Sequence, residues 1–401
     1  MIVYFLYCFV GCFLGVVTGL IPGVHVNLVC LLGLSLYPFL GVDTISFAVL
    51  MVSVSLTHTF LDFIPAIFLG VPEEETALSI LPTHRMYLEG RSLDAVKLTG
   101  YGSLLGLFFS LLFIVPALYI IPLLHGLLRQ VIVWVMFFAL GALILREKRW
   151  GKAKALLIVV LSGALGLSSF KLKVLSSSQV LFPLFSGMFG LATIIYSLYT
   201  RPTQTNVPQQ SFSHVEVDLG VVGSGFLGSI GGMLVGVLPA FSPSQVGILM
   251  ARLYGSSVAR FLVAVSAINT ADAIYSFVAL YTLGNPRSGV ATMLSKVLTM
   301  DALLFALFVG VFAFCGLWAY LLHLYVGRVS ASFFSKINYR LISILVVGFV
   351  SSLVFVFTGF FGILVLFFAT VLGLMPPLGG VSRTHLMGVL IIPTMFFFLG
   401  L

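Results

Sequence analysis

Charged residues are scarce in this sequence. Lysine, arginine, aspartate and glutamate make up 8% of its 401 residues, whereas hydrophobic residues make up 60%. Soluble domains carry about 25% charged residues, so this balance excludes an ordinary soluble protein. A membrane β-barrel is excluded as well, because the apolar runs are continuous and do not alternate with polar residues.

Metal ligands and catalytic signatures are also lacking. The four cysteines lie in apolar surroundings without metal-ligand spacing, which predicts buried or lipid-facing thiols. We find no zinc-protease, serine-hydrolase, P-loop or nicotinamide-binding signature. The sequence therefore predicts no enzyme, no metal site and no cofactor. It also lacks a basic-aromatic pattern, so no nucleic-acid partner is expected.

Long apolar runs are what the sequence does contain. Several exceed the ~18 residues that mark a membrane-spanning helix, and the mean hydropathy is +1.19. They predict an all-α polytopic membrane protein with about 10–14 membrane segments, located in the cell membrane. The first run lacks a basic start and a cleavage site, so we expect a retained helix and not a signal peptide.

The two halves of the chain carry the same landmarks in the same order. The matching pairs are Gly19-Leu-Ile-Pro22 with Gly236-Val-Leu-Pro239, and Leu69-Gly70-Val-Pro72 with Leu283-Gly284-Asn-Pro286. A polar stretch, 201–216, lies between the halves and reads as a linker. We therefore predict a first transmembrane repeat over 1–200 and a second over 217–401.

Basic loops give the orientation of the two repeats. In the first half the most basic loop, 146–154, follows the fifth apolar segment. In the second half the basic loop at Arg328 to Arg340 follows the fourth segment. Because basic loops stay cytoplasmic, corresponding loops of the two halves should face opposite sides of the membrane. This is the pattern of inverted-topology repeats with broken or re-entrant helices.

The first landmark of each half is a break in apolar sequence. Unwound backbone survives in a bilayer only inside protein or beside a watery cavity, and a matched pair of Gly/Pro breaks points to a transporter's substrate site. Arg383 beside a Gly-rich segment suits a bound carboxylate or phosphate. Helix kinks for packing, and an arginine reaching the lipid headgroups, are the structural alternatives. The predicted substrate-binding residues are Pro22, Gly23, His25, Asn27, Pro239, Ser242, Ser244, Gln245 and Arg383.

Polar side chains inside the predicted spans form a second set of candidates. Ionisable residues in a span are costly and by default functional, and a His–Asp pair can carry protons near neutral pH. A satisfied structural pair between helices is the alternative. The candidates for the coupling ion are His58, Asp62, Glu73, Asp272 and Asn269.

At the same residues the chain resembles the TctA family, the large membrane subunit of tripartite tricarboxylate transporters, in its archaeal branch. The resemblance rests on Gly-x-Ile-Pro22-Gly23, Gly236-x-x-Pro239, the Leu69-Gly-x-Pro72 region and Phe182-Pro183-Leu-Phe-x-Gly187. It implies a secondary transporter for carboxylate anions, with a small membrane subunit and an extracytoplasmic binding protein as partners. Ala240 follows Pro239 where the family has glycine, which leaves the substrate open.

These observations lead to one functional expectation with two alternatives. We expect a secondary active transporter that moves a di- or tricarboxylate by alternating access, coupled to a Na⁺ or H⁺ gradient, with the substrate between the two broken loops. The alternatives are a transporter of a polyprenyl-phosphate lipid carrier and an uncoupled channel or membrane scaffold. The sequence leaves the oligomeric state open, with a homodimer as one candidate.

Overall fold

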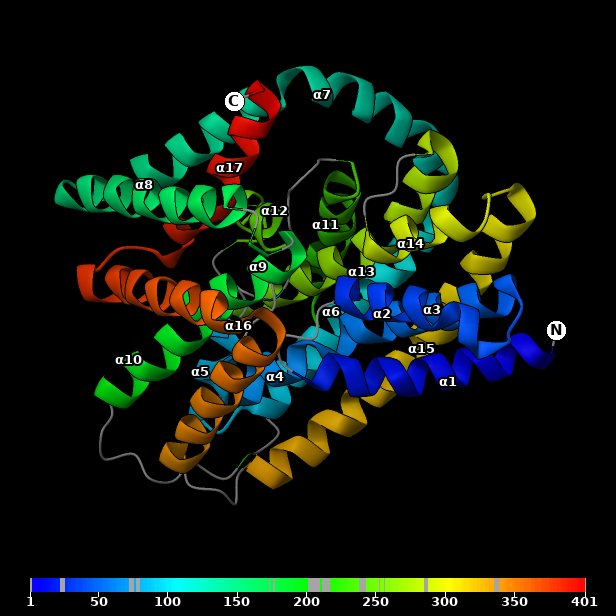
Figure 1. Cartoon of the computed structure of the whole chain (residues 1–401), viewed down its shortest axis with the longest axis horizontal. Helices are drawn as coiled ribbons and strands as arrows, with labels where there is room; N and C mark the ends of the chain where they lie inside the picture. Colours follow the sequence, from blue (N-terminus) through cyan, green and yellow to red (C-terminus); the bar gives the residue numbers. More distant parts are fainter. Residues whose placement is uncertain are drawn as a thin grey trace.

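The protein is built from helices throughout the part of the chain that its structure describes (Figure 1). A computed structural model of the chain describes residues 2–21, 26–71, 76, 80–172, 174–175, 177–200, 210, 217–237, 243–251, 253–255, 257–284, 288–334 and 339–400. Within those ranges no strand occurs, and the predicted all-α polytopic fold is confirmed.

The helices follow the apolar runs of the sequence closely. In the first half they are α1 (Ile2–Leu20), α2 (Val26–Leu40), α3 (Thr44–Leu61), α4 (Phe63–Phe68), α5 (Ile80–Leu88), α6 (Ser92–Leu112), α7 (Ile114–Leu145), α8 (Trp150–Lys171), α9 (Ser177–Phe185), η1 (Ser186–Leu191) and α10 (Ala192–Thr200). In the second half they are α11 (Leu219–Val235), α12 (Pro243–Leu249), α13 (Val258–Leu283), α14 (Gly289–Val297), α15 (Ala302–Phe334), α16 (Tyr339–Gly379), η2 (Arg383–Met387) and α17 (Gly388–Leu399).

Eight of the described helices are long and apolar enough to cross a membrane. A ninth span arises if α7, which bends by 84° between its two apolar halves, counts as one. Helices α2 and α12 have only 15 and 7 residues, too few to cross about 30 Å of hydrocarbon at 1.5 Å per residue. Their lengths agree with the prediction of short segments, and their re-entrant course stays a prediction.

Each half begins with two helices that run parallel and pack through glycine. A Cβ atom at Gly11 or Gly15 of α1 would lie 2.5 Å or 2.6 Å from the Cβ atoms of Ser53 and Thr57 on α3. Along α11, a Cβ at Gly232 would lie 2.6 Å from that of Ala271 on α13, and Gly228 meets α13 one turn earlier. Small residues at four-residue spacing let helix backbones approach closely in a membrane. The two halves therefore share one packing device.

The helices that follow these pairs cross into the other half. Helix α6 lies parallel to α13, and α15 lies parallel to α3, as the successive contacts along each pair require. Between α6 and α13, Gly102 lies against Val263 and Gly106 against Ala267. Between α3 and α15, Ser53 contacts Cys315 and Phe60 contacts His323. Helix α6 runs antiparallel to α15, because Val96 meets Gly327 and Leu107 meets Gly316. It follows that α3 and α13 run in opposite directions.

This arrangement has the directions expected of inverted repeats. Helices near the end of the second half also pack on helices near the end of the first half. Helix α17 packs on α8, and α16 packs on η1 and α9. Helix α16 kinks at Gly359, whose φ of 64° lies in the left-handed region that favours glycine. The boundaries of the two repeats stay a prediction.

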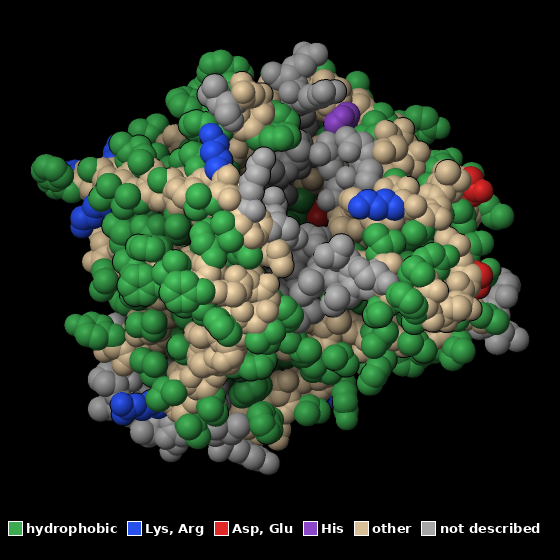
Figure 2. Space-filling model, in the orientation of Figure 1, with side chains coloured by type: hydrophobic (Ala, Val, Ile, Leu, Met, Phe, Trp, Pro, Cys, Tyr) green, Lys and Arg blue, Asp and Glu red, His purple; other side chains and the backbone are tan. Residues whose placement is uncertain are grey.

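The outside of the molecule is apolar. Large hydrophobic side chains are exposed along α1, α7, α15 and α16, and the face in Figure 2 carries few charged groups among them. By contrast, 94% of an 18-residue window within Thr44–Phe68 and 89% of such a window within α13 are buried. Lipid therefore contacts the outer helices, whereas α3, α4 and α13 form the core of the protein.

The close packing of α11 gives a first prediction. Gly228→Ala places a Cβ 2.5 Å from the Ala264 carbonyl oxygen, so we expect destabilisation by about 1–3 kcal/mol through overpacking. Gly223→Ala on the same helix is the control, because no atom lies within 4 Å of its added Cβ. Thermal unfolding in detergent should show a lower Tm for the first variant only. Equal melting temperatures would contradict the close α11–α13 contact.

Candidate functional site

A buried carboxylate and a buried amide meet where the two central helices cross. The Asn269 side chain on α13 donates from Nδ2 to Oδ2 of Asp62 at 3.0 Å and to the Thr59 carbonyl oxygen at 3.3 Å. Asp62 and Asn269 are each 3% exposed. A charged-group hydrogen bond deep in a span offsets part of the cost of removing the carboxylate from water. Two predicted coupling-ion residues, from different halves, thus lie in contact.

The chain interrupts its helix at Asp62. This residue ends α3 and precedes α4, and its backbone N–H still donates to the His58 carbonyl oxygen at 3.0 Å. Two residues into α4, Pro65 supplies no N–H and so weakens the regular ladder of the span. The Asp62 carboxylate lies against α13, where Asn269 donates to it. The nearby His58 ring contacts the Thr18 hydroxyl on α1 through Nδ1 at 3.1 Å.

Asp272 holds a related position in the second half. It is half-buried on α13, and the Ser276 hydroxyl donates to its Oδ1 at 3.4 Å. A Cβ at Gly232 of α11 would lie 2.8 Å from the Asp272 nitrogen, just as a Cβ at Gly19 of α1 would lie 3.3 Å from the Asp62 nitrogen. The last turns of α1 and α11, which lead into the two predicted breaks, therefore pass beside the two aspartates.

Most of the predicted loop residues lie outside the described part of the chain. Those outside it are Pro22, Gly23, His25, Glu73, Pro239 and Ser242, together with the side chains of Asn27 and Gln245. Ser244 is described and fully buried at the start of α12, which packs on α13. The role of Glu73 in binding the coupling ion, and of the other residues in binding substrate, stays a prediction.

Arg383 lies apart from the Asp62–Asn269 contact. It begins η2, is 7% exposed, and its guanidinium donates to the Thr193 hydroxyl on α10. The sequence offered no acidic neighbour for Arg383, and among the described residues no carboxylate pairs with it. A buried cation without a carboxylate is the environment in which a bound anion is most favoured.

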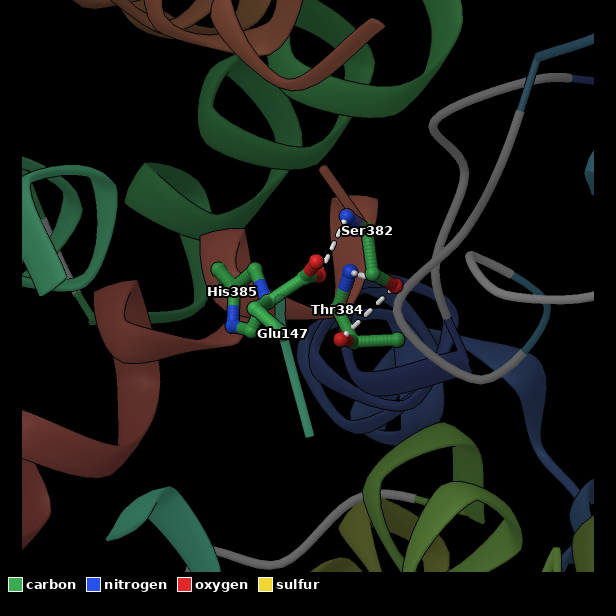
Figure 3. Close-up of polar contacts among 4 residues, drawn as sticks. All are labelled: Glu147, Ser382, Thr384 and His385. Atoms are coloured by element: carbon green, nitrogen blue, oxygen red, sulfur yellow. Dashed lines mark hydrogen bonds and ion pairs between the residues drawn. The ribbon is translucent and has the colours of Figure 1, made fainter. Parts of the chain in front are cut away.

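The segment that carries Arg383 is tied to the α7–α8 junction by Glu147. Oε1 of Glu147 accepts from the Ser382 N–H and from Nε2 of His385, both at 2.9 Å, and Figure 3 shows the three groups together. The Lys154 ammonium adds a bond to the Gly379 carbonyl oxygen at 2.9 Å. Three residues of this segment, Gly379, Ser382 and His385, are thereby held by side chains from the α7–α8 junction and from the start of α8.

Sequence reasoning missed several of these groups. Glu147 reads locally as one acid in a basic loop, and its partners lie 235 and 238 residues away. Likewise His323, fully buried on α15, meets the Phe60 and Val96 carbonyl oxygens at 2.7 Å and 2.9 Å, and so joins α3, α6 and α15. Only the general cost of an intramembrane histidine could have marked it from the sequence.

These features define a multi-pass α-helical membrane protein with a polar centre between two interrupted halves. The sequence profile of the tripartite tricarboxylate transporter TctA family matches residues 5–388. The chain belongs to that family, as its Pro-Gly breaks predicted, and it is a membrane component of a transporter and not an enzyme.

One curated relative extends over the full length. An uncharacterized protein of Methanocaldococcus jannaschii is 27% identical over 410 residues, and the alignment covers 98% of both chains. No solved structure matches the chain. The relative agrees with the predicted archaeal branch but names no substrate.

The contact between the central helices gives a second prediction. Asn269→Ala removes a donor from the buried Asp62 carboxylate, so we expect a loss of about 1–3 kcal/mol in stability, measured by thermal unfolding in detergent. Thr282→Ala is the control, since its hydroxyl bonds only to the Val278 carbonyl of its own helix. An unchanged Tm for Asn269→Ala would show that this contact does not hold α13 against α3.

Glu147 gives a third prediction, on pH. The Ser382 N–H, and next the His385 ring, hold the pKa of this carboxyl below its usual range. Because the folded pKa is the lower one, the stabilisation is complete above the unfolded pKa of about 4.3 and is lost as the pH falls through the folded value. The Tm difference between the unmodified protein and Glu147→Gln should therefore be largest near neutral pH and shrink below about pH 4.

A second carboxyl provides the control for this pH series. Glu89→Gln removes a carboxyl from an exposed i,i+4 pair with Arg85, where ion pairs contribute about 0–1 kcal/mol. We expect little change in Tm from this variant at any pH. If the Glu147→Gln and unmodified proteins had the same Tm at every pH, the contacts of Glu147 with Ser382 and His385 would be contradicted.

Proposed function

We propose that this chain moves an organic anion of the di- or tricarboxylate class by alternating access, coupled to a Na⁺ or H⁺ gradient. Membership of a tricarboxylate transporter family supports the substrate class. The observation that carries the coupling is the buried contact of Asp62 with Asn269 between helices of opposite direction. A carboxylate in that position binds a proton or a sodium ion, and both bring the positive charge that an anion needs to enter hydrocarbon.

The substrate belongs beside this centre in our proposal. Helix α1 ends beside Asp62 and α11 passes beside Asp272. The breaks at 22–27 and 239–245 follow these two helices in the chain. Helix ends inside a membrane offer N–H groups to anions and carbonyl groups to cations. Substrate and coupling ion would then occupy neighbouring positions, so that neither moves without the other.

Two further subunits are part of the proposal. The family name describes a three-component transporter. We therefore expect a small membrane subunit and an extracytoplasmic binding protein to deliver the anion. The exposed apolar faces of α1 and α15 are available to lipid or to such a subunit.

The decisive variant is Asp62→Asn, which keeps the shape of the side chain but removes its charge. In proteoliposomes we expect ion-driven citrate uptake to fall at least about tenfold, because a neutral amide no longer binds the coupling cation. Asp301→Asn is the matched control, since that carboxylate is exposed and caps only the start of α15. Wild-type uptake by Asp62→Asn would rule out this residue as the coupling site.

A binding measurement avoids any need for partner subunits. A ligand present at 100 times its Kd stabilises the folded state by about 2.7 kcal/mol, so a raised Tm identifies it. We expect citrate to raise the Tm more strongly with Na⁺ or at low pH than in K⁺ at neutral pH. Stabilisation by a polyprenyl phosphate alone would support a lipid-carrier transporter, and citrate flux without any ion gradient would support a channel.

A further inference from the structure

A cavity of about 870 Å³ opens around Arg383, away from the Asp62–Asn269 contact. It lies between α5, α10, the first residues of α13 and the segment that joins α16 to η2. Its wall carries hydroxyl groups from Thr193, Tyr196, Ser197 and Ser382 among apolar side chains. Small-ligand sites have volumes of about 300–1,000 Å³ and this mixture of apolar walls with a few polar groups.

One charge in this cavity is not balanced. The exposed Arg85 and Arg91 side chains, which also line it, pair with Glu89 at 2.8 Å and with Asp94 at 3.1 Å. Arg383 is 93% buried by contrast, and its described contact is the neutral hydroxyl of Thr193. A hydroxyl does not neutralise a guanidinium, whereas a carboxylate does so with two parallel hydrogen bonds. The cavity therefore has the charge and donors for a carboxylate.

The position of Arg383 is fixed before any ligand arrives. Glu147 holds the neighbouring Ser382 N–H and the His385 ring, as Figure 3 shows, and Thr193 holds the guanidinium. An arginine held in place loses little side-chain entropy when an anion binds. The contacts from α7–α8 and α10 thus make a preorganised anion site.

The cavity lies well apart from the central contact. Ala259, which lines it, is ten residues before Asn269 on α13, which corresponds to about 15 Å along a helix. The Ala259 side of the cavity is thus separated from the Asp62–Asn269 contact by nearly three turns of α13. The cavity is a separate station on the path of the anion.

Basic side chains gather at the same end of the molecule. Glu147 joins the junction that carries Arg146, Lys148 and Arg149 to Ser382 in the cavity wall. The Tyr87 hydroxyl of α5 donates to the Phe334 carbonyl oxygen at 3.4 Å, which places the half of α15 that carries Arg328 on this side. Because basic segments stay cytoplasmic, this end faces the cytoplasm.

We propose that this cavity is a cytoplasmic vestibule that binds a polycarboxylate anion through Arg383. The identity of the ligand rests on the proposed function, but the site itself rests on the cavity and on its buried arginine. An anion that leaves the central site is caught there by Arg383 and released to the cytoplasm from the open side.

Citrate binding to the full-length protein in nanodiscs, measured by calorimetry, tests the site. Arg383→Gln removes a charged hydrogen bond of about 1.5–3 kcal/mol, so the Kd should rise about ten- to hundredfold, and Arg383→Lys should fall between. Arg260→Gln is the control: it removes an exposed basic group that pairs with Asp218 outside the cavity, and it should leave the Kd within about twofold. Wild-type affinity in a folded Arg383→Gln protein would overturn the proposal.

The same measurement separates this proposal from the coupling site. Asp62→Asn should abolish ion-driven uptake yet keep citrate binding at Arg383. If Asp62→Asn transports normally while Arg383→Gln loses binding, the coupling assignment fails and the vestibule remains. Inorganic phosphate that binds at Arg383 where citrate does not would overturn the polycarboxylate assignment.

Thiol labelling tests which side the cavity faces and does not depend on Arg383 variants. All four native cysteines are buried, so Ser197→Cys adds one accessible thiol in the cavity wall. A membrane-impermeant maleimide should label it in inside-out vesicles, and citrate should slow the labelling. Labelling in right-side-out vesicles alone, or at a rate that citrate does not change, would overturn the proposal.

Discussion

Every polar group that enters the hydrocarbon layer must find its partner inside the protein, and the rest of this structure depends on how that is met at Asp62. The carboxylate needs a donor, and Asn269 brings one from the opposite half of the chain. To reach it, α3 and α13 must lie in contact at the centre. The glycine contacts of α1 and α11 make this arrangement compact, and α6 and α15 then close around the two central helices.

The same constraint separates two kinds of charge in the protein. Asp62 is enclosed at mid-span, where a proton or a sodium ion would balance it. Arg383 is enclosed near the basic end, where an anion would balance it. In the proposed mechanism, a solute that carries negative charge across the protein would meet Asp62 with its coupling cation first and Arg383 second. This order suits a transporter that brings its two cargoes together and then parts them.

The sequence predicted the helices well, because membrane thickness imposes long apolar runs that are easy to recognise. It also singled out His58, Asp62 and Asn269 as coupling-ion candidates, since polar residues in a span are rare and costly, and that role stays a prediction. It could not predict that Asp62 meets Asn269 and not Asp272, because the crossing of α3 and α13 is set by packing. Glu147 and Thr193 were invisible for the same reason: each acts on a residue about 190 or more positions away.

The contact between Asp62 and Asn269 also has a consequence for how the protein is made. Its two partners are 207 residues apart in the chain, so α3 leaves the ribosome long before α13 exists. During that interval the carboxylate lacks the donor that Asn269 provides in the folded protein. Helix α3 can therefore complete its packing only after the second half of the chain has been made.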